Sequence, residues 1–203
     1  MLDILLRYDA VFWDFDGVLM DSNPVRDFGF AETLAAYPQE EVNALLDYHR
    51  ANGGLSRYVK FRYFFEVIRK EQITDAEVGE WALRFSGVVK KLLLDPALLI
   101  DETFNWVKQH HQHLPMHIVS GSDQSELREV CSYHAVAGFF KSISGSPTPK
   151  KQLVAAIISE YGYNSGKCVL VGDSVNDFEA AQFNGMHFFP YNNSRISSFN
   201  TCI

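Results

Sequence analysis

An apolar run that ends in two closely spaced carboxylates is the feature that most constrains this chain. Residues 8–15 contain the β-branched and aromatic residues typical of a buried parallel strand. Asp14 and Asp16 lie at its end, and Gly17, which tolerates the backbone angles of a sharp turn, follows them. Ligands of open α/β sheets bind outside the carboxyl ends of the strands. The pattern therefore predicts an α/β fold in which a metal and a phosphate could meet at this strand end.

A second acidic cluster far downstream strengthens this interpretation. The Asp-x-Asp-Gly pattern alone also occurs in turns and calcium loops. Asp173 and Asp177, however, follow another apolar run, residues 168–171. Carboxylates gathered at neighbouring strand ends repel one another unless a cation compensates them, and hard oxygen ligands suit Mg²⁺. The two clusters together predict a Mg²⁺ site.

The spacing of apolar residues predicts two structural units. Residues 23–95 show only helical spacing, at 28–37, 40–50, 56–70 and 75–94, with Gly53 and Gly54 as a break. Beyond residue 100, helices at 102–111, 125–133, 150–161 and 176–184 alternate with strands at 116–119, 141–144, 168–171 and 187–189, which is typical of a parallel sheet. We predict an α/β core formed by residues 1–22 and 96–203, and an inserted all-helical unit formed by residues 23–95. Residues 21–24 and the neighbourhood of Asp95 would be the hinge strands that join them.

Four motifs in order along the chain resemble those of the haloacid dehalogenase superfamily. They are residues 14–19, residues 120–122 after a strand, Lys150, and residues 172–177. The chain is most similar to the phosphoglycolate phosphatase-like group, in which a helical cap is inserted after the first strand of a Rossmann-like core. The resemblance covers nearly the whole chain and identifies residues 23–95 as the cap.

The resemblance implies a Mg²⁺-dependent phosphatase, a phosphoric monoester hydrolase acting on a small phosphorylated metabolite through an aspartyl-phosphate. Asp14 would be the nucleophile and a metal ligand, and Asp16 the general acid and base, with its backbone carbonyl on the metal. Asp173 would bind the metal directly and Asp177 through water. The phosphoryl oxygens would be bound by Ser120, by N–H groups around Gly121 and by Lys150.

Two neighbouring lysines compete for the third motif, because the chain reads Pro149-Lys150-Lys151 where the group more often has Lys-Pro-x-Pro. Lys150 is preferred, since Pro149 is favourable at the start of a helix. Lys151 is the alternative.

Two basic residues of the cap, Arg57 and Lys60, admit two interpretations. They lie in a basic stretch of an acidic chain and could bind an anionic or hydroxyl-rich second part of the substrate. The alternative, which is the more common situation for basic residues on a helix, is that they belong to a solvated face.

Composition excludes several classes of function. The 203 residues include 18 basic and 25 acidic side chains, a net charge of −7, which argues against nucleic-acid and anionic-membrane partners. Three scattered cysteines do not indicate a disulfide framework. No stretch has the length and apolarity of a membrane span. We expect a cytoplasmic protein; the sequence predicts no oligomeric state.

Three alternatives use the same motifs. A phosphomutase like β-phosphoglucomutase would pass the phosphoryl group to a second hydroxyl instead of water. A phosphonatase would need a cap lysine for an imine, for which Lys60 is available. A catalytically silent binding protein could keep the fold without the chemistry.

Overall fold

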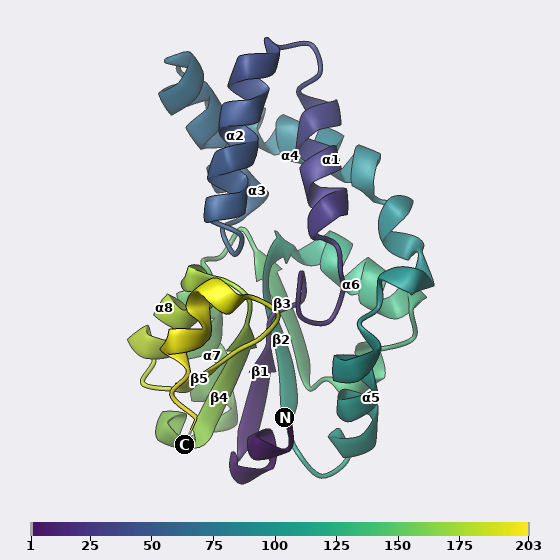
Figure 1. Ribbon diagram of the computed structural model, residues 1–203, viewed down its shortest axis with the longest axis vertical. Coiled ribbons are helices and arrows are strands. Elements are labelled where there is room, and N and C mark those ends of the chain that lie inside the picture. The colour runs from purple at the N-terminus through teal and green to yellow at the C-terminus, as the bar shows by residue number, and fades with distance from the viewer. Residues whose placement is uncertain (1, 203) are drawn as a thin grey trace.

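A parallel five-stranded sheet forms the centre of the protein, as seen in a computed structural model that describes residues 2–202 (Figure 1). Its strands stand in the order β3-β2-β1-β4-β5. They are β1 (Ala10–Trp13), β2 (Met116–Asp123), β3 (Ser142–Ser146), β4 (Cys168–Gly172) and β5 (His187–Pro190). The predicted α/β class is confirmed; β2 to β5 include most of the residues predicted for them, and β1 covers only the middle of the predicted run 8–15.

The first strand is apolar throughout because both of its faces are covered. Successive side chains of a strand point to opposite faces. Val11 and Trp13 accordingly pack with helices α5 (Asp101–His110) and α6 (Gln124–Tyr133). Ala10 and Phe12 pack with helices α7 (Lys150–Tyr161) and α8 (Val175–Phe183) on the other face. All four residues of β1 are fully buried, so this strand, and the carboxylates that follow it, are held in the middle of the core.

Between β1 and β2 the described chain forms helices and no further strand of the sheet, and four of these helices gather beyond the carboxyl ends of the strands (Figure 1). They are α1 (Asn23–Thr33), α2 (Gln39–Ala51), α3 (Arg57–Tyr63), which continues as a π-helix over Phe64–Arg69, and α4 (Asp75–Val89). The first begins five residues earlier than predicted. Pro24 stands in its first turn, where its missing N–H costs nothing, so the predicted hinge at residues 21–24 is partly helical.

The two segments that lead into and out of these helices run side by side. The Asp21 N–H donates to the Leu98 carbonyl at 2.7 Å, and the Ile100 N–H donates to the Leu19 carbonyl at 3.0 Å. These bonds tie the entry and exit of the cap to each other. The boundaries at residues 22/23 and 95/96 remain a prediction.

Within residues 2–202, no helix is both long enough and apolar enough to cross a membrane.

The amino end of α4 offers a local test of this fold. The Thr74 Oγ1 accepts a hydrogen bond from the Glu77 N–H at 3.3 Å, while the Glu77 carboxylate accepts from the Thr74 N–H at 2.8 Å. Thr74→Ala is expected to lower the free energy of unfolding by about 1 kcal/mol, because the orphan N–H of Glu77 loses the hydroxyl oxygen that accepts its hydrogen bond. Denaturant unfolding would measure it, with Thr74→Ser, which keeps the hydroxyl, as the control. An unchanged midpoint in Thr74→Ala would contradict the capping role.

Candidate active site

The pairing of two strands distant in sequence brings the predicted acidic clusters together. Trp13 of β1 lies opposite Val171 of β4, and the Asp14 N–H donates to the Val171 carbonyl at 2.9 Å. Asp14 and Asp173 therefore leave neighbouring strand ends. Carboxylate oxygens of Asp14, Asp173 and Asp177 all lie within 4.8 Å of one another.

Burial and mutual repulsion make these carboxylates hard to ionise without a cation. Burial raises the pKa of Asp14 well above its usual range, and the charge of Asp177 raises it further. Burial and Asp177 likewise raise the pKa of Asp173 to about 7. A bound cation would offset this repulsion and lower the pKa values of both carboxyl groups, as expected at a metal site.

Among the described residues, Lys150 is the basic side chain that contacts this carboxylate cluster. Its Nζ lies 2.8 Å from Oδ1 of Asp14 and also contacts Asp177, and its side chain is 1% exposed. Burial alone lowers the pKa of this amine, but the two carboxylates raise it above the usual range, so Lys150 is charged. Lys151 instead lies over the ring of Phe183, 5.3 Å from its centroid. The structure thus brings the preferred lysine to the site.

The donor set fits Mg²⁺. Asp14 and Asp173 supply hard carboxylate oxygens on adjacent strand ends. Both carboxylate oxygens of Asp177 already have partners in the protein. One contacts Lys150, and the other accepts a hydrogen bond from the Ser174 N–H at 3.0 Å, as part of the capping box at the start of α8. A fixed orientation of this kind suits a ligand that acts through water, as the family resemblance implies.

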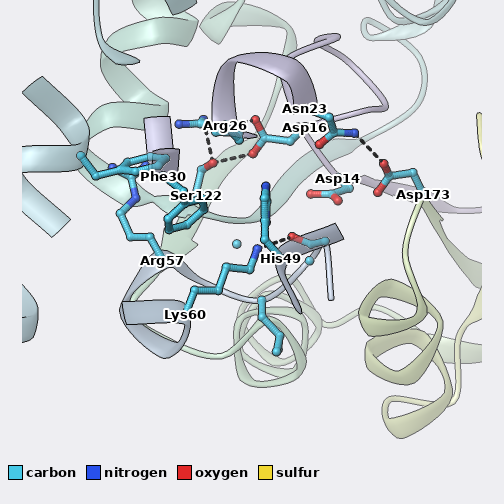
Figure 2. Close-up of a pocket in the computed structure, with 15 residues that line it drawn as sticks. Asp14, Asp16, Asn23, Arg26, Phe30, His49, Arg57, Lys60, Ser122 and Asp173 are labelled. Atoms are coloured by element: carbon cyan, nitrogen blue, oxygen red, sulfur yellow. Dashed lines mark hydrogen bonds and ion pairs between the residues drawn. The ribbon is translucent and has the colours of Figure 1, made fainter. Parts of the chain in front are cut away.

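Asp16 does not belong to this cluster of three carboxylates, and its side chain points toward Arg26 and Ser122, away from Asp14 and Asp173 (Figure 2). One oxygen accepts from the Ser22 hydroxyl and from Nε of Arg26 at 3.0 Å, and the other from the Ser122 hydroxyl. Burial alone raises the pKa of Asp16, but Arg26 and the hydroxyls lower it to about 2. Asp16 is thus a carboxylate here.

Ser120 and Gly121 lie within β2, which extends past the predicted strand end at residue 119. Ser120 is buried, and its Oγ accepts from the Ser122 N–H at 3.0 Å. Gly121 faces the cap: a Cβ here would lie 2.4 Å from the Gly54 carbonyl oxygen, and a Cβ on Gly54 would lie 2.6 Å from Oγ of Ser174. Two glycines therefore let the cap loop rest directly on the core.

A pocket between the cap and the strand ends joins these groups (Figure 2). Of the predicted site residues, Asp14, Asp16, Gly121, Asp173, Arg57 and Lys60 line it. Ser120, Lys150 and Asp177 do not line the pocket. Lys150 contacts Asp14 and Asp177 from within the protein. Further lining residues are Asn23, Arg26, Phe30, His49, Gly53, Gly54, Leu55, Phe85 and Ser122.

The interpretation of Arg57 and Lys60 as a solvated helix face is wrong, because both are buried, with 5% and 2% exposure. The Lys60 Nζ donates to the Gly53 carbonyl at 3.0 Å and lies 5.9 Å from the centre of the Phe30 ring. Burial, followed by repulsion from Arg26 despite the attraction of Asp16, lowers its pKa to about 7.

Among the residues that sequence reasoning missed are two buried charged side chains that form ion pairs at this site. Arg26 bonds Asp16 and Ser122 from the cap helix α1, and Glu126 bonds both Arg26 and Arg57. A signal existed for Arg26, because it lies four residues before the buried Phe30 on one helical face. Glu126 carried no such signal, since an acid in the first turn of a helix is ordinary.

Comparison with known proteins gives the family. The model of the haloacid dehalogenase-like hydrolases matches residues 8–185. Fructose-1-phosphate phosphatase YqaB of Escherichia coli (strain K12) is 23% identical over 191 residues, which cover 89% of this chain and 94% of that protein. The chain therefore belongs to the haloacid dehalogenase-like hydrolases.

Solved structures agree on the fold. β-Phosphoglucomutase from Clostridium difficile superimposes with a TM-score of 0.75 at 13% identity, covering 95% of this chain and 90% of that one. CbbY from Rhodobacter sphaeroides, solved with xylulose 1,5-bisphosphate, gives 0.69 at 16% identity, with 93% and 89% coverage. At these identities the likeness establishes the fold alone.

The lowered pKa of Lys60 predicts a pH-dependent stability. The folded pKa, about 7, lies below the ordinary 10.5, so the unfolded chain binds more protons between these values. Stability should therefore rise with pH from 7 to 10, by at most about 1.4 kcal/mol per pH unit.

Denaturant unfolding at pH 7.5 and 9.5 would measure this contribution as the difference between wild type and Lys60→Met. The variant should gain less stability as the pH rises. Lys108→Met, on the exposed face of α5, is the control and should behave as wild type. Equal pH dependence in Lys60→Met and wild type would contradict the buried amine.

Proposed function

We propose that the protein is a Mg²⁺-dependent phosphatase that hydrolyses a small phosphorylated metabolite through an aspartyl-phosphate. The observation that carries this proposal is the buried Asp14 carboxylate, which opens into the pocket while Lys150 and Asp173 flank it. A nucleophile, a fixed cation and a metal-binding carboxylate at one strand end are the parts that phosphoryl transfer needs.

The first step forms the Asp14–phosphorus bond and breaks the ester bond. An Asp14 oxygen attacks phosphorus, and the leaving alkoxide takes a proton from Asp16. In the second step water attacks the phosphorus of the aspartyl-phosphate, Asp16 accepts the water's proton, and inorganic phosphate leaves as Asp14 is regenerated.

Asp16 stands in the form that the second step requires. With its pKa near 2 it is a carboxylate, held by Arg26, Ser22 and Ser122. To act as the acid of the first step it must gain a proton, and an anionic phosphate arriving beside it raises its pKa in that direction. We therefore propose that Asp16 becomes protonated when the substrate is bound.

The remaining groups bind and neutralise the phosphoryl oxygens. Lys150 supplies a fixed positive charge, while Ser120 and the N–H groups around Gly121 offer hydrogen bonds. When bound by Asp14, Asp173, Asp177 and the Asp16 carbonyl, Mg²⁺ would neutralise the charge of the transferring group. The contact between Gly54 and Gly121 keeps the cap close to the reacting centre, which limits the entry of water.

A phosphonatase is the second candidate, because the buried amine of Lys60 has a pKa of about 7. An amine that is partly neutral at physiological pH can attack a carbonyl and form an imine. Borohydride trapping with a phosphonated aldehyde would label Lys60 if this alternative holds. The phosphomutase alternative uses the residues of the phosphatase and differs in the acceptor of the phosphoryl group.

Release of phosphate from an aryl phosphate should require both Mg²⁺ and Asp14. Removal of Mg²⁺ with a chelator, or the substitution Asp14→Asn, should abolish turnover, because the amide keeps the shape but loses the nucleophilic charge. Asp21→Asn, an exposed carboxylate of the same segment, is the control. Near-normal turnover by folded Asp14→Asn would refute the nucleophile assignment.

The two lysines at the start of α7 form a matched pair. Lys150→Ala should lower kcat by about 10²- to 10³-fold for every phosphate ester, since its charge acts on the group common to all of them. Lys151→Ala should have little effect, because this side chain lies over Phe183. Steady-state kinetics on two unrelated esters would measure both, and a crippled Lys151→Ala beside an active Lys150→Ala would overturn the assignment.

A further inference from the structure

Two arginines in the pocket wall are already occupied by one carboxylate of the core. Arg57 of α3 donates to both oxygens of Glu126, Nη1 to Oε2 at 2.9 Å and Nη2 to Oε1 at 2.5 Å. Arg26 of α1 donates from Nη1 to Oε1 of the same carboxylate at 2.5 Å. All three side chains are buried. Glu126, on α6, thus lies behind two cap arginines and binds both.

Further donors of these arginines are also directed to the protein. Arg57 donates from Nη1 to the Ser86 hydroxyl at 2.6 Å. Arg26 uses Nε for Asp16 and Nη2 for Ser122 at 2.9 Å. A guanidinium whose bidentate face is taken by a carboxylate cannot present that face to a phosphate. The wall therefore resembles a phosphate site whose ligand position is filled by Glu126.

The charges of this wall cancel. Arg26 forms ion pairs with Asp16 and Glu126, and Arg57 forms one with Glu126, so that two carboxylates match two guanidinium groups. For Glu126, burial alone raises the pKa, and the two arginines more than offset it. A second phosphate group entering this half of the pocket would find no net positive charge among these four residues.

Lys60 is the other described cation that lines this half of the pocket. Its Nζ donates to the Gly53 carbonyl, and burial followed by repulsion from the arginines weakens its hold on a proton. One such amine cannot compensate a buried dianion, and an uncompensated buried charge is costly. It can instead donate a hydrogen bond to a neutral hydroxyl.

We infer that Glu126 is a specificity-determining residue, which occupies Arg26 and Arg57 and so excludes substrates that carry a second phosphate group. The inference rests on the proposed phosphatase function and narrows its substrates to monophosphates whose second end is uncharged. It also bears on the phosphomutase alternative. Transfer of a phosphoryl group to a sugar monophosphate produces a bisphosphate, which this pocket would have to hold.

Matched pairs of substrates test the exclusion in the wild-type enzyme. Fructose 1-phosphate and fructose 1,6-bisphosphate differ only in the second phosphate, as do glucose 1-phosphate and glucose 1,6-bisphosphate. We expect kcat/KM for the monophosphate to exceed that for the bisphosphate by about 100-fold in a pair that is accepted. Comparable values for the two members, or activity on the bisphosphates alone, overturn the inference.

Two substitutions should move this ratio in opposite directions. Glu126→Gln keeps the shape but leaves the two arginines uncompensated, so discrimination should fall by about tenfold or more. Arg57→Gln removes a cation and leaves Glu126 paired with Arg26, so discrimination should rise. Glu129→Gln, one turn further along α6 in an exposed ion pair with Lys90, is the control and should not change it.

A purely steric pocket would respond in the same direction to both substitutions, or to neither, and either result overturns the inference. If Glu126→Gln does not fold, the rise expected in Arg57→Gln decides it.

A binding measurement separates this inference from the proposed function. Calorimetric dissociation constants of the same pairs for Asp14→Asn need no turnover. Tighter binding of the monophosphates supports the exclusion even if the wild type hydrolyses nothing, in which case only the phosphatase proposal fails. Equal binding, or binding of neither member of either pair, refutes the role of Glu126 even if aryl phosphate is hydrolysed.

Discussion

Repulsion among three carboxylates, two of them buried and one half-buried, is the constraint around which the site is built. Asp14, Asp173 and Asp177 leave two adjacent strands and the helix that follows, and nothing in a parallel sheet itself compensates their charge. Lys150 supplies one positive charge from within the core. The net charge that remains suits a divalent cation, and the same cation would be needed to bring an anionic phosphate to an anionic nucleophile.

A second network determines how the cap sits on the core. Arg26 belongs to the cap yet bonds Asp16, and Glu126 belongs to the core yet bonds two cap arginines. Gly54 and Gly121 let the backbones approach where these ion pairs form. Cap position and the state of Asp16 are therefore linked, because moving α1 away would remove the cation that lowers the pKa of this carboxylate.

The core could be predicted from sequence because its signals are local. The apolar run of β1 reports burial on both faces, and the logic of parallel strands brings Asp14 and Asp173 to one edge. The sequence pattern predicts the start of α1 too late, because Pro24 is compatible with a hinge as well as with a first helical turn. The core residues that the cap helices contact were not predictable from the sequence. Helical spacing identifies one face of α3 but not what lies opposite, so Arg57 had no visible partner until the fold brought Glu126 to it.

The two networks divide the pocket into halves with different chemistry. Around Asp14 the groups carry excess negative charge and call for a cation and a phosphate, whereas around Glu126 the ionised groups already neutralise one another. Because the local dielectric is low, an uncompensated charge is costly in either half. The half around Asp14 therefore favours binding of a cation, and the half around Glu126 disfavours binding of any further charged group. Asp16 stands between the halves, bonded to Arg26 yet at the end of β1. Under the proposed function, a substrate that fills both halves would be oriented by charge, with its phosphate at Asp14 and its uncharged end beneath the cap.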